Sequence, residues 1–333
     1  MEKILIMPVV LGFFVTLFSL PYWIKKAKRA GLVWEDMHKI GRQKKIPGSG
    51  GITVVFGFVL GVLSYIAIKT FILETDTTTV QIFALMTTIL IVGFVGLIDD
   101  ILGWIHGGLS TKLRIFLVVT ASIPLIVINA GVSSMMGLEL GLIYPLILIP
   151  LGVVGATVTF NFIEGYNGLA ASQGILILSA LSLVTYLNET TWLSLICLIM
   201  ISCLFAFYVF NKVPAKIFPG DVLTYPIGAL IAVVAILGNI EKIAIFFFIP
   251  YILETGLKVR GKLRKQSIAK LNSRGGLEMP YEKFYGIEHI GIYLLKKIKK
   301  RGEVHEKELV WFINAFQILI ILLGFLLFRG GIT

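Results

Sequence analysis

Two adjacent aspartates, Asp99 and Asp100, follow an uncharged apolar run from Val80 to Ile98. A charged side chain inside the hydrocarbon layer of a membrane costs roughly 2.5–3.5 kcal/mol on insertion scales, and adjacent carboxylates also repel each other. The pair therefore favours a site for a cation, a charged substrate or proton chemistry at a membrane edge. A solvated helix end is the alternative interpretation.

Other segments of the chain carry residues with related chemistry. Carboxylate and amide oxygens suit Mg²⁺, which also takes phosphate oxygens of a substrate. Basic side chains suit a diphosphate, and glycines let backbone N–H groups approach phosphate closely. Together these groups predict a reaction between a nucleotide and a membrane lipid. The segments are Glu35-Asp36, residues 41–51, Asn161–Leu169, Phe218–Asp221 and the basic loop from Lys258.

The composition predicts what kind of helix positions these residues. Of the 333 residues, 57% are hydrophobic and 15% are charged, whereas soluble proteins carry about 25% charged residues. A membrane-spanning helix needs about 20 apolar residues. We therefore predict an all-α polytopic membrane protein with residues 1–333 forming a single domain. The ten predicted spans are 4–24, 52–73, 80–98, 113–130, 140–160, 170–187, 192–210, 222–237, 243–257 and 309–328.

Lysine and arginine predict the orientation of the spans. If the first span runs inward, 26 of the 30 basic residues fall in inner loops, as the positive-inside rule requires. Both termini then face outward, and all the polar segments face the cytoplasm. This topology explains the net charge of +11 without a nucleic-acid partner. We expect a multi-pass protein of a prokaryotic cell membrane rather than of the endoplasmic reticulum.

The last inner loop also carries a membrane signal. Apolar residues recur at helical spacing from Ile287 to Ile298, beside Lys296, Lys297 and Lys299. This pattern predicts an amphipathic helix on the inner surface that contacts anionic membrane lipid. A solvated helix is the alternative.

At these residues the chain resembles the polyprenyl-phosphate N-acetylhexosamine-1-phosphate transferases, and most of all the branch that makes dolichyl-diphosphate N-acetylglucosamine. The resemblance implies an enzyme with ten spans that transfers GlcNAc-1-phosphate from UDP-GlcNAc to dolichyl phosphate on the cytoplasmic face. UMP is released, in the first step of lipid-linked oligosaccharide assembly for N-glycosylation. The stretches that carry it are GLVWEDMHKIGRQKKIP, GLIDD, NFIEGYNGLAASQ, IFPGDVLTYPIGALIAVVAILGNIEKIAIFFFIP and LEMPYEKF.

The resemblance also implies roles for individual residues. Asn161 and Asp221 match the ligands of Mg²⁺, for which Mn²⁺ can substitute. Asp99, Asp100 and Lys112 match the catalytic groups. The stretch 154–162 matches the groove for the lipid phosphate. Residues that match substrate contacts are Glu35, Asp36, Met37, Asn167 and Phe218, with Arg260, Arg264 and Lys265 as candidates to grip the diphosphate where the family has an Arg/His cluster.

Several alternatives stay open from the sequence. A transferase of the same family could use another UDP-N-acetylhexosamine or undecaprenyl phosphate. A lipid or solute transporter is the rival from another class, although its polar groups would lie deep in the spans rather than at one edge. The sequence also leaves open whether two copies form a homodimer, and whether Glu164 is a site residue or a solvated loop acid. His38 is predicted to lie at the surface.

Overall fold

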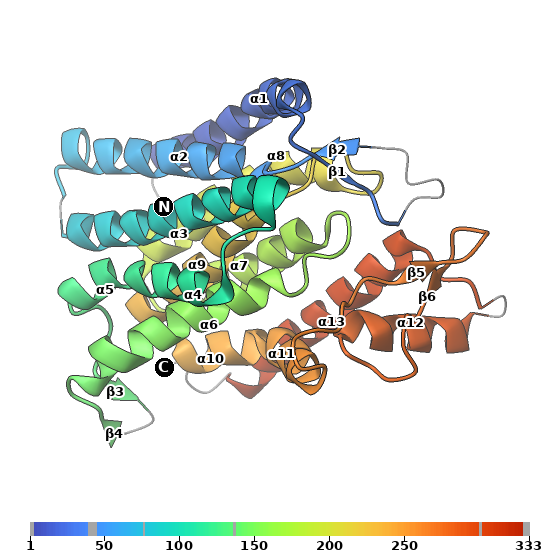
Figure 1. Cartoon of the computed structure of the whole chain (residues 1–333). Helices are drawn as coiled ribbons and strands as arrows, with labels where there is room; N and C mark the ends of the chain where they lie inside the picture. Colours follow the sequence, from blue (N-terminus) through green and yellow to red (C-terminus); the bar gives the residue numbers. More distant parts are fainter. Residues whose placement is uncertain (1–2, 39–44, 76, 136–137, 300–301, 329–333) are drawn as a thin grey trace.

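The computed structural model describes residues 3–38, 45–75, 77–135, 138–299 and 302–328. The first four residues of the predicted polar segment 41–51 lie outside these residues. In the described part the chain is mainly helical, and its long helices lie side by side in one bundle (Figure 1). The long helices are α1 (Ile6–Ala30), α2 (Gly51–Phe71), α3 (Thr79–His106), α6 (Ile149–Asn161), α7 (Leu169–Leu187), α8 (Thr191–Asn211), α9 (Asp221–Leu237) and α13 (Glu306–Leu327).

Shorter elements connect and flank these helices. The short helices are η1 (Lys3–Leu5), α4 (Thr111–Thr120), α5 (Ile123–Val127), η2 (Tyr144–Leu148), α10 (Glu241–Phe247), α11 (Ile249–Arg260) and α12 (Ile287–Ile298). Three two-stranded antiparallel hairpins complete the described fold: β1 (Val33–Glu35) with β2 (Lys45–Pro47), β3 (Ser134–Met135) with β4 (Leu138–Glu139), and β5 (Lys270–Leu271) with β6 (Leu277–Glu278).

The helices agree with the predicted class of polytopic membrane protein. In the described residues, seven helices are long and apolar enough to cross a membrane. The other three predicted spans fall on α9, which has 17 residues, and on the broken pairs α4–α5 and α10–α11. The second helix of each pair has proline in its first turn, at Pro124 and Pro250. Proline is tolerated there because N–H groups of the first turn form no hydrogen bond within the helix.

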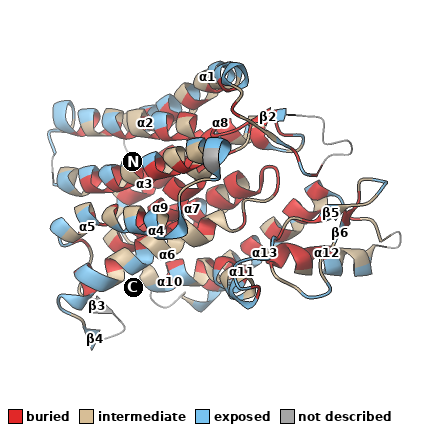
Figure 2. Ribbon diagram, viewed as in Figure 1, coloured by how far each residue is buried: buried red, intermediate tan, exposed pale blue. Residues whose placement is uncertain are grey.

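Helix α9 forms the centre of the bundle. Every residue from Val222 to Ile236 is buried, and α2, α3, α6 and α7 pack around it (Figure 2). Two glycines allow the closest approaches. A Cβ atom at Gly96 of α3 would lie 2.5 Å from the Asp221 backbone, and one at Gly228 of α9 would lie 2.5 Å from the Ala156 carbonyl of α6. The backbone of α3 is therefore held against the beginning of α9, and that of α6 against its middle.

The predicted polar segments gather at one end of the molecule. Hairpins β1–β2 and β5–β6 and helix α12 lie at this end, and hairpin β3–β4 lies at the opposite end (Figure 1). Helix α12 has the bounds predicted from its amphipathic pattern. Its Ile292 is fully buried and Ile298 is 74% exposed, and the helix packs along α13. Its contact with anionic lipid stays a prediction.

Candidate functional site

The end of α3 and the beginning of α9 meet through Asp100. Its carboxylate accepts hydrogen bonds from the backbone N–H of Asp221 at 2.8 Å and of Val222 at 3.4 Å. The first N–H groups of a helix have no partner inside the helix, and the positive end of the helix dipole favours a negative charge there. Gly220 precedes α9 with φ of +72°, a conformation that glycine adopts without steric cost. This junction fixes the position of Asp221.

The end of α6 brings an amide and a second carboxylate to the same place. The Asn161 side-chain nitrogen lies 2.5 Å from Asp221 Oδ1, 2.9 Å from Thr224 Oγ1 and 3.3 Å from Glu164 Oε2. Glu164 Oε1 in turn accepts a hydrogen bond from the Gly220 N–H at 3.1 Å. Glu164, which the sequence left open as a solvated loop acid, therefore belongs to the site.

The environment of Glu164 shifts the pKa of its side chain. Burial raises the pKa of its carboxyl group, and the nearby charges of Asp221 and Asp100 raise it further. Three acidic side chains from three different elements thus share one small region. Such a group is stable only when a proton or a cation offsets the charge.

These residues fit a divalent cation. A side-chain amide carries two N–H hydrogens, whereas Asn161 nitrogen faces three oxygens. With the amide turned over, its oxygen would join the carboxylates of Asp221 and Glu164 around one point. Oxygen donors of this kind are the ligands that Mg²⁺ takes in proteins.

Asp99 contacts a different partner from its neighbour. Its Oδ2 lies 3.1 Å from Arg114 Nε in an ion pair, and its Oδ1 accepts a hydrogen bond from the Leu109 N–H at 2.6 Å. Asp99 is 6% exposed and Arg114 is 30% exposed, so the guanidinium group reaches solvent from the site wall. Lys112, the predicted catalytic cation, is exposed on the first turn of α4 and does not line the site.

A second cluster lies across the same pocket. Asn167 donates a hydrogen bond from its side-chain amide to Asp36 at 3.0 Å and from its backbone N–H to Glu306 at 2.8 Å. His38 Nδ1 lies 3.7 Å from Glu306, and the His38 ring stacks on Tyr166 at 4.4 Å. Ligand atoms of Asp36, His38 and Glu306 lie within 4.8 Å of one another, so this cluster is also a possible metal site.

The prediction that His38 lies at the surface is wrong, because His38 is only 8% exposed. It packs between Tyr166 and Glu306, which come from distant parts of the chain. The sequence offered no signal for Glu306, since it begins a helix 139 residues after Asn167.

One cavity of about 530 Å³ joins the two clusters, which is within the usual size of ligand pockets. Of the predicted site residues, Lys112, Arg260, Arg264 and Lys265 do not line it. Among the described lysines and arginines, Arg114 is the one that does. The predicted residues in the lining are Glu35, Asp36, Met37, Asp99, Asp100, Asn161, Asn167, Phe218 and Asp221.

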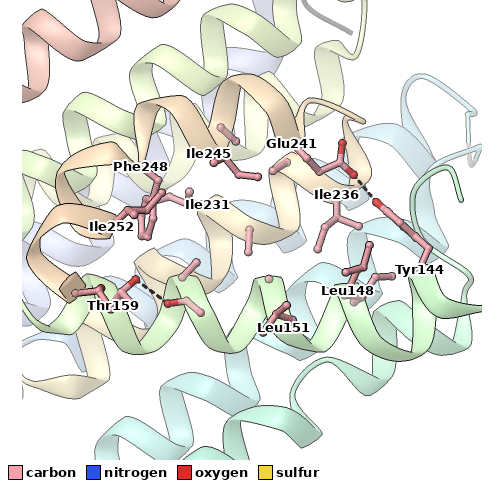
Figure 3. A pocket seen from close by; sticks show the side chains of 18 residues that line it. Tyr144, Leu148, Leu151, Thr159, Ile231, Ile236, Glu241, Ile245, Phe248 and Ile252 are labelled. Carbon is pink, nitrogen blue, oxygen red and sulfur yellow. Dashed lines mark hydrogen bonds between the residues drawn. The ribbon is translucent and has the colours of Figure 1, made fainter. Parts of the chain in front are cut away.

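A separate apolar groove of about 430 Å³ runs along helix α6. It lies between η2–α6 on one side and α9, α10 and α11 on the other (Figure 3). Gly155 and Thr159 of α6 line the groove, and Asn161, two residues further on, lines the polar cavity. The groove overlaps the predicted lipid-phosphate stretch 154–162.

Comparison with known proteins places these features in a family. Residues 82–239 match the family model described as glycosyl transferase family 4. The chain is 34% identical to a protein of Saccharolobus solfataricus assigned by name as a UDP-N-acetylglucosamine–dolichyl-phosphate N-acetylglucosaminephosphotransferase, over 96% of this chain and 92% of the relative.

Two further relatives have related names. A Sulfolobus acidocaldarius protein with the same name is 31% identical over 95% of each chain. A phospho-N-acetylmuramoyl-pentapeptide-transferase of Streptococcus pyogenes is 28% identical over 74% of this chain and 76% of the relative.

Proposed function

Because the chain belongs to glycosyl transferase family 4, we propose that it transfers N-acetylglucosamine 1-phosphate from UDP-N-acetylglucosamine to dolichyl phosphate and releases UMP. Two relatives that align over almost the whole chain carry the name of this activity. We further propose ten membrane crossings in an archaeal or other prokaryotic cell membrane, with both termini outside and the site on the cytoplasmic face.

One observation carries the proposal. Helix α6 lines the apolar groove with Thr159 and ends in the polar cavity with Asn161. A prenyl chain in the groove whose phosphate passes the end of α6 would bring that phosphate to the carboxylates and Arg114. The uridine and sugar would occupy the remainder of the cavity, beside Asn167, Phe218 and the Glu35–Met37 segment.

The reaction is a phosphoryl transfer. An oxygen of the lipid phosphate attacks the β-phosphorus of the nucleotide-sugar, the bond from that phosphorus to the UMP oxygen breaks, and UMP leaves with the electron pair. A phosphate monoester has a second pKa near 6, so the attacking oxygen is largely ionised at neutral pH. Direct displacement without a covalent enzyme intermediate is then sufficient.

The residues of the site have separate tasks. Asp221 and Asn161, with Glu164 beside them, would hold a divalent cation, either Mg²⁺ or Mn²⁺. Such an ion, when bound, neutralises charge on the diphosphate oxygens. Asp99 orients Arg114, whose guanidinium group pairs with phosphate oxygens. Asp100 positions Asp221 by holding the beginning of α9.

The purified protein should be incubated with Mg²⁺, dolichyl phosphate and a panel of UDP-GlcNAc, UDP-GalNAc and UDP-MurNAc-pentapeptide. We expect UMP and lipid-linked N-acetylglucosamine only when UDP-GlcNAc and lipid phosphate are both present. Preference for another sugar, or for undecaprenyl phosphate, would assign a different reaction in the same family. Substrate movement across sealed vesicles without UMP release would contradict the proposal and favour a transporter.

A further inference from the structure

The two ends of the apolar groove differ in chemistry. At the end beside the polar cavity, Thr159 donates its hydroxyl hydrogen bond to the Gly155 carbonyl within its own helix. At the other end, the Tyr144 hydroxyl donates a hydrogen bond to the Glu241 carboxylate across the groove (Figure 3). Tyr144 begins η2 and Glu241 begins α10, so this pair joins the two walls.

Both members of the pair are held in place. Tyr144 is 3% exposed, and a Cβ atom at Gly131 would lie 2.5 Å from its hydroxyl oxygen, so the outer loop supports the tyrosine from behind. Glu241 lies in the first turn of α10, where the helix dipole favours a carboxylate. Because Tyr144 is buried, loss of Glu241 would leave its hydroxyl group unpaired, which is costly for a buried polar group.

We propose that the Tyr144–Glu241 pair is an end stop that determines how many isoprene units of the lipid substrate the groove holds. This inference rests on the proposed function, because it assumes a prenyl chain in the groove. Tyr144 and Glu241 are specificity-determining residues here and take no part in phosphoryl transfer.

The length of the groove makes the stop relevant. Tyr144 precedes Thr159 by 15 residues, which corresponds to about 22 Å of helix. Leu151, Ile245 and Ile252 line the groove and are 64%, 49% and 51% exposed, so one side is open to lipid. A prenyl chain longer than the groove must turn out through this side at the pair, and only the units before the stop gain contacts with protein.

The test is a competition experiment on the intact protein. Polyprenyl phosphates of increasing length, from three isoprene units upward, compete in one micelle preparation, and the products are quantified by mass spectrometry. For the wild type, relative kcat/KM should rise with each isoprene unit until the groove is filled and then stay level. For Tyr144→Ala, which removes the ring at the stop, the level region should begin about one isoprene unit later.

Three further variants test whether the Tyr144–Glu241 pair is an end stop or a contact that only stabilises the fold. Glu241→Ala removes the partner of Tyr144 and should shift the profile in the same direction if Tyr144→Ala does not fold. Gly152→Leu places a side chain in the groove, where a Cβ atom has its nearest contact at 3.9 Å, and should shift the profile to shorter chains. Tyr65→Ala, a buried tyrosine of α2 that does not line the groove, is the matched control and should leave the profile unchanged.

Each outcome has one meaning. If Tyr144→Ala and Glu241→Ala lower turnover equally for all chain lengths, the pair is a structural link and the inference is wrong. A wild-type profile without any dependence on length also overturns the inference, although the proposed function stands. If the wild type forms no lipid-linked product from any chain, the proposed function itself fails.

Discussion

Asp100 and Asp221, 121 residues apart in sequence, are joined by a 2.8 Å hydrogen bond from the Asp221 backbone N–H to the Asp100 carboxylate. The bond makes Asp100 a cap for α9 that is supplied by a neighbouring helix. Asp99, its sequence neighbour, is bound instead to Arg114 and the Leu109 N–H. The two adjacent aspartates therefore make different contacts, and we propose that Asp100 acts on the cation site by holding Asp221 while Asp99 orients Arg114 toward the substrate phosphate.

This difference predicts distinct effects for Asp100→Asn and Asp99→Asn. An asparagine at 100 retains one acceptor oxygen but loses the charge at the helix end, so the free energy of unfolding should fall by about 1 kcal/mol. Asp99→Asn should raise KM for the lipid phosphate, because Arg114 loses its orienting partner. Thermal unfolding in detergent and initial rates measure the two effects, with the exposed carboxylate variant Glu282→Gln as control. Equal, full activity in both aspartate variants would contradict both assignments.

Arg114 is expected to supply the cation that Lys112 was predicted to supply. Arg114→Ala should lower kcat by about 10²–10³, the usual effect of removing a group that stabilises transition-state charge. Arg114→Lys should restore part of the activity, because lysine keeps the charge and loses the bidentate geometry. Lys112→Ala, on the same helix, is the control and should retain near wild-type rates. The assignment is wrong if Lys112→Ala is the more damaging of the two alanine variants.

The exchange of Arg114 for Lys112 shows how far the sequence could predict the site. The hydropathy of the sequence predicted where the helices lie. The unequal distribution of lysine and arginine between the loops predicted that the polar segments lie at one end. Both predictions depend only on local composition. Residues two apart on a helix point about 200° apart, so Arg114 lines the cavity and Lys112 does not. The sequence could not indicate which side of α4 would face α3.

Contacts between distant segments were the other limit. Glu306 reaches Asn167 only because α13 packs against α7, and no local pattern encodes that packing. The break between α10 and α11 was also missed, since an apolar run with proline predicts a span whether or not the helix bends. That break shapes the groove, so the groove could not be delimited from the sequence.

Removal of divalent cations should abolish transfer. EDTA is expected to stop UMP release, and added Mg²⁺ to restore it, because the carboxylates of Asp221 and Glu164 meet the Asn161 amide near one point. Asn161→Asp keeps an oxygen ligand and should retain more activity than Asn161→Ala, with a lower Mg²⁺ requirement. Full turnover in EDTA, or full activity of Asp221→Ala, would contradict the metal assignment. Thr190→Ala, at a distant turn between α7 and α8, is a suitable control.

Glu288 predicts a pH dependence of stability that is separate from the active site. Both carboxylate oxygens are buried beside the Glu254 carboxylate. Burial, followed by the nearby charge of Glu254, raises the pKa of Glu288 well above 4.5. A group whose pKa is raised by folding stabilises the fold while it is protonated, and this contribution is lost as the pH rises from the unfolded-state pKa through the folded-state pKa. Glu288→Gln cannot ionise, so its Tm should exceed that of the wild type at pH 7–8 and match it below about pH 4.5. Differential scanning fluorimetry across this range measures the effect, with the exposed Glu278→Gln as control. A Tm difference that does not change with pH would show that Glu288 does not become protonated on folding in the way its burial predicts.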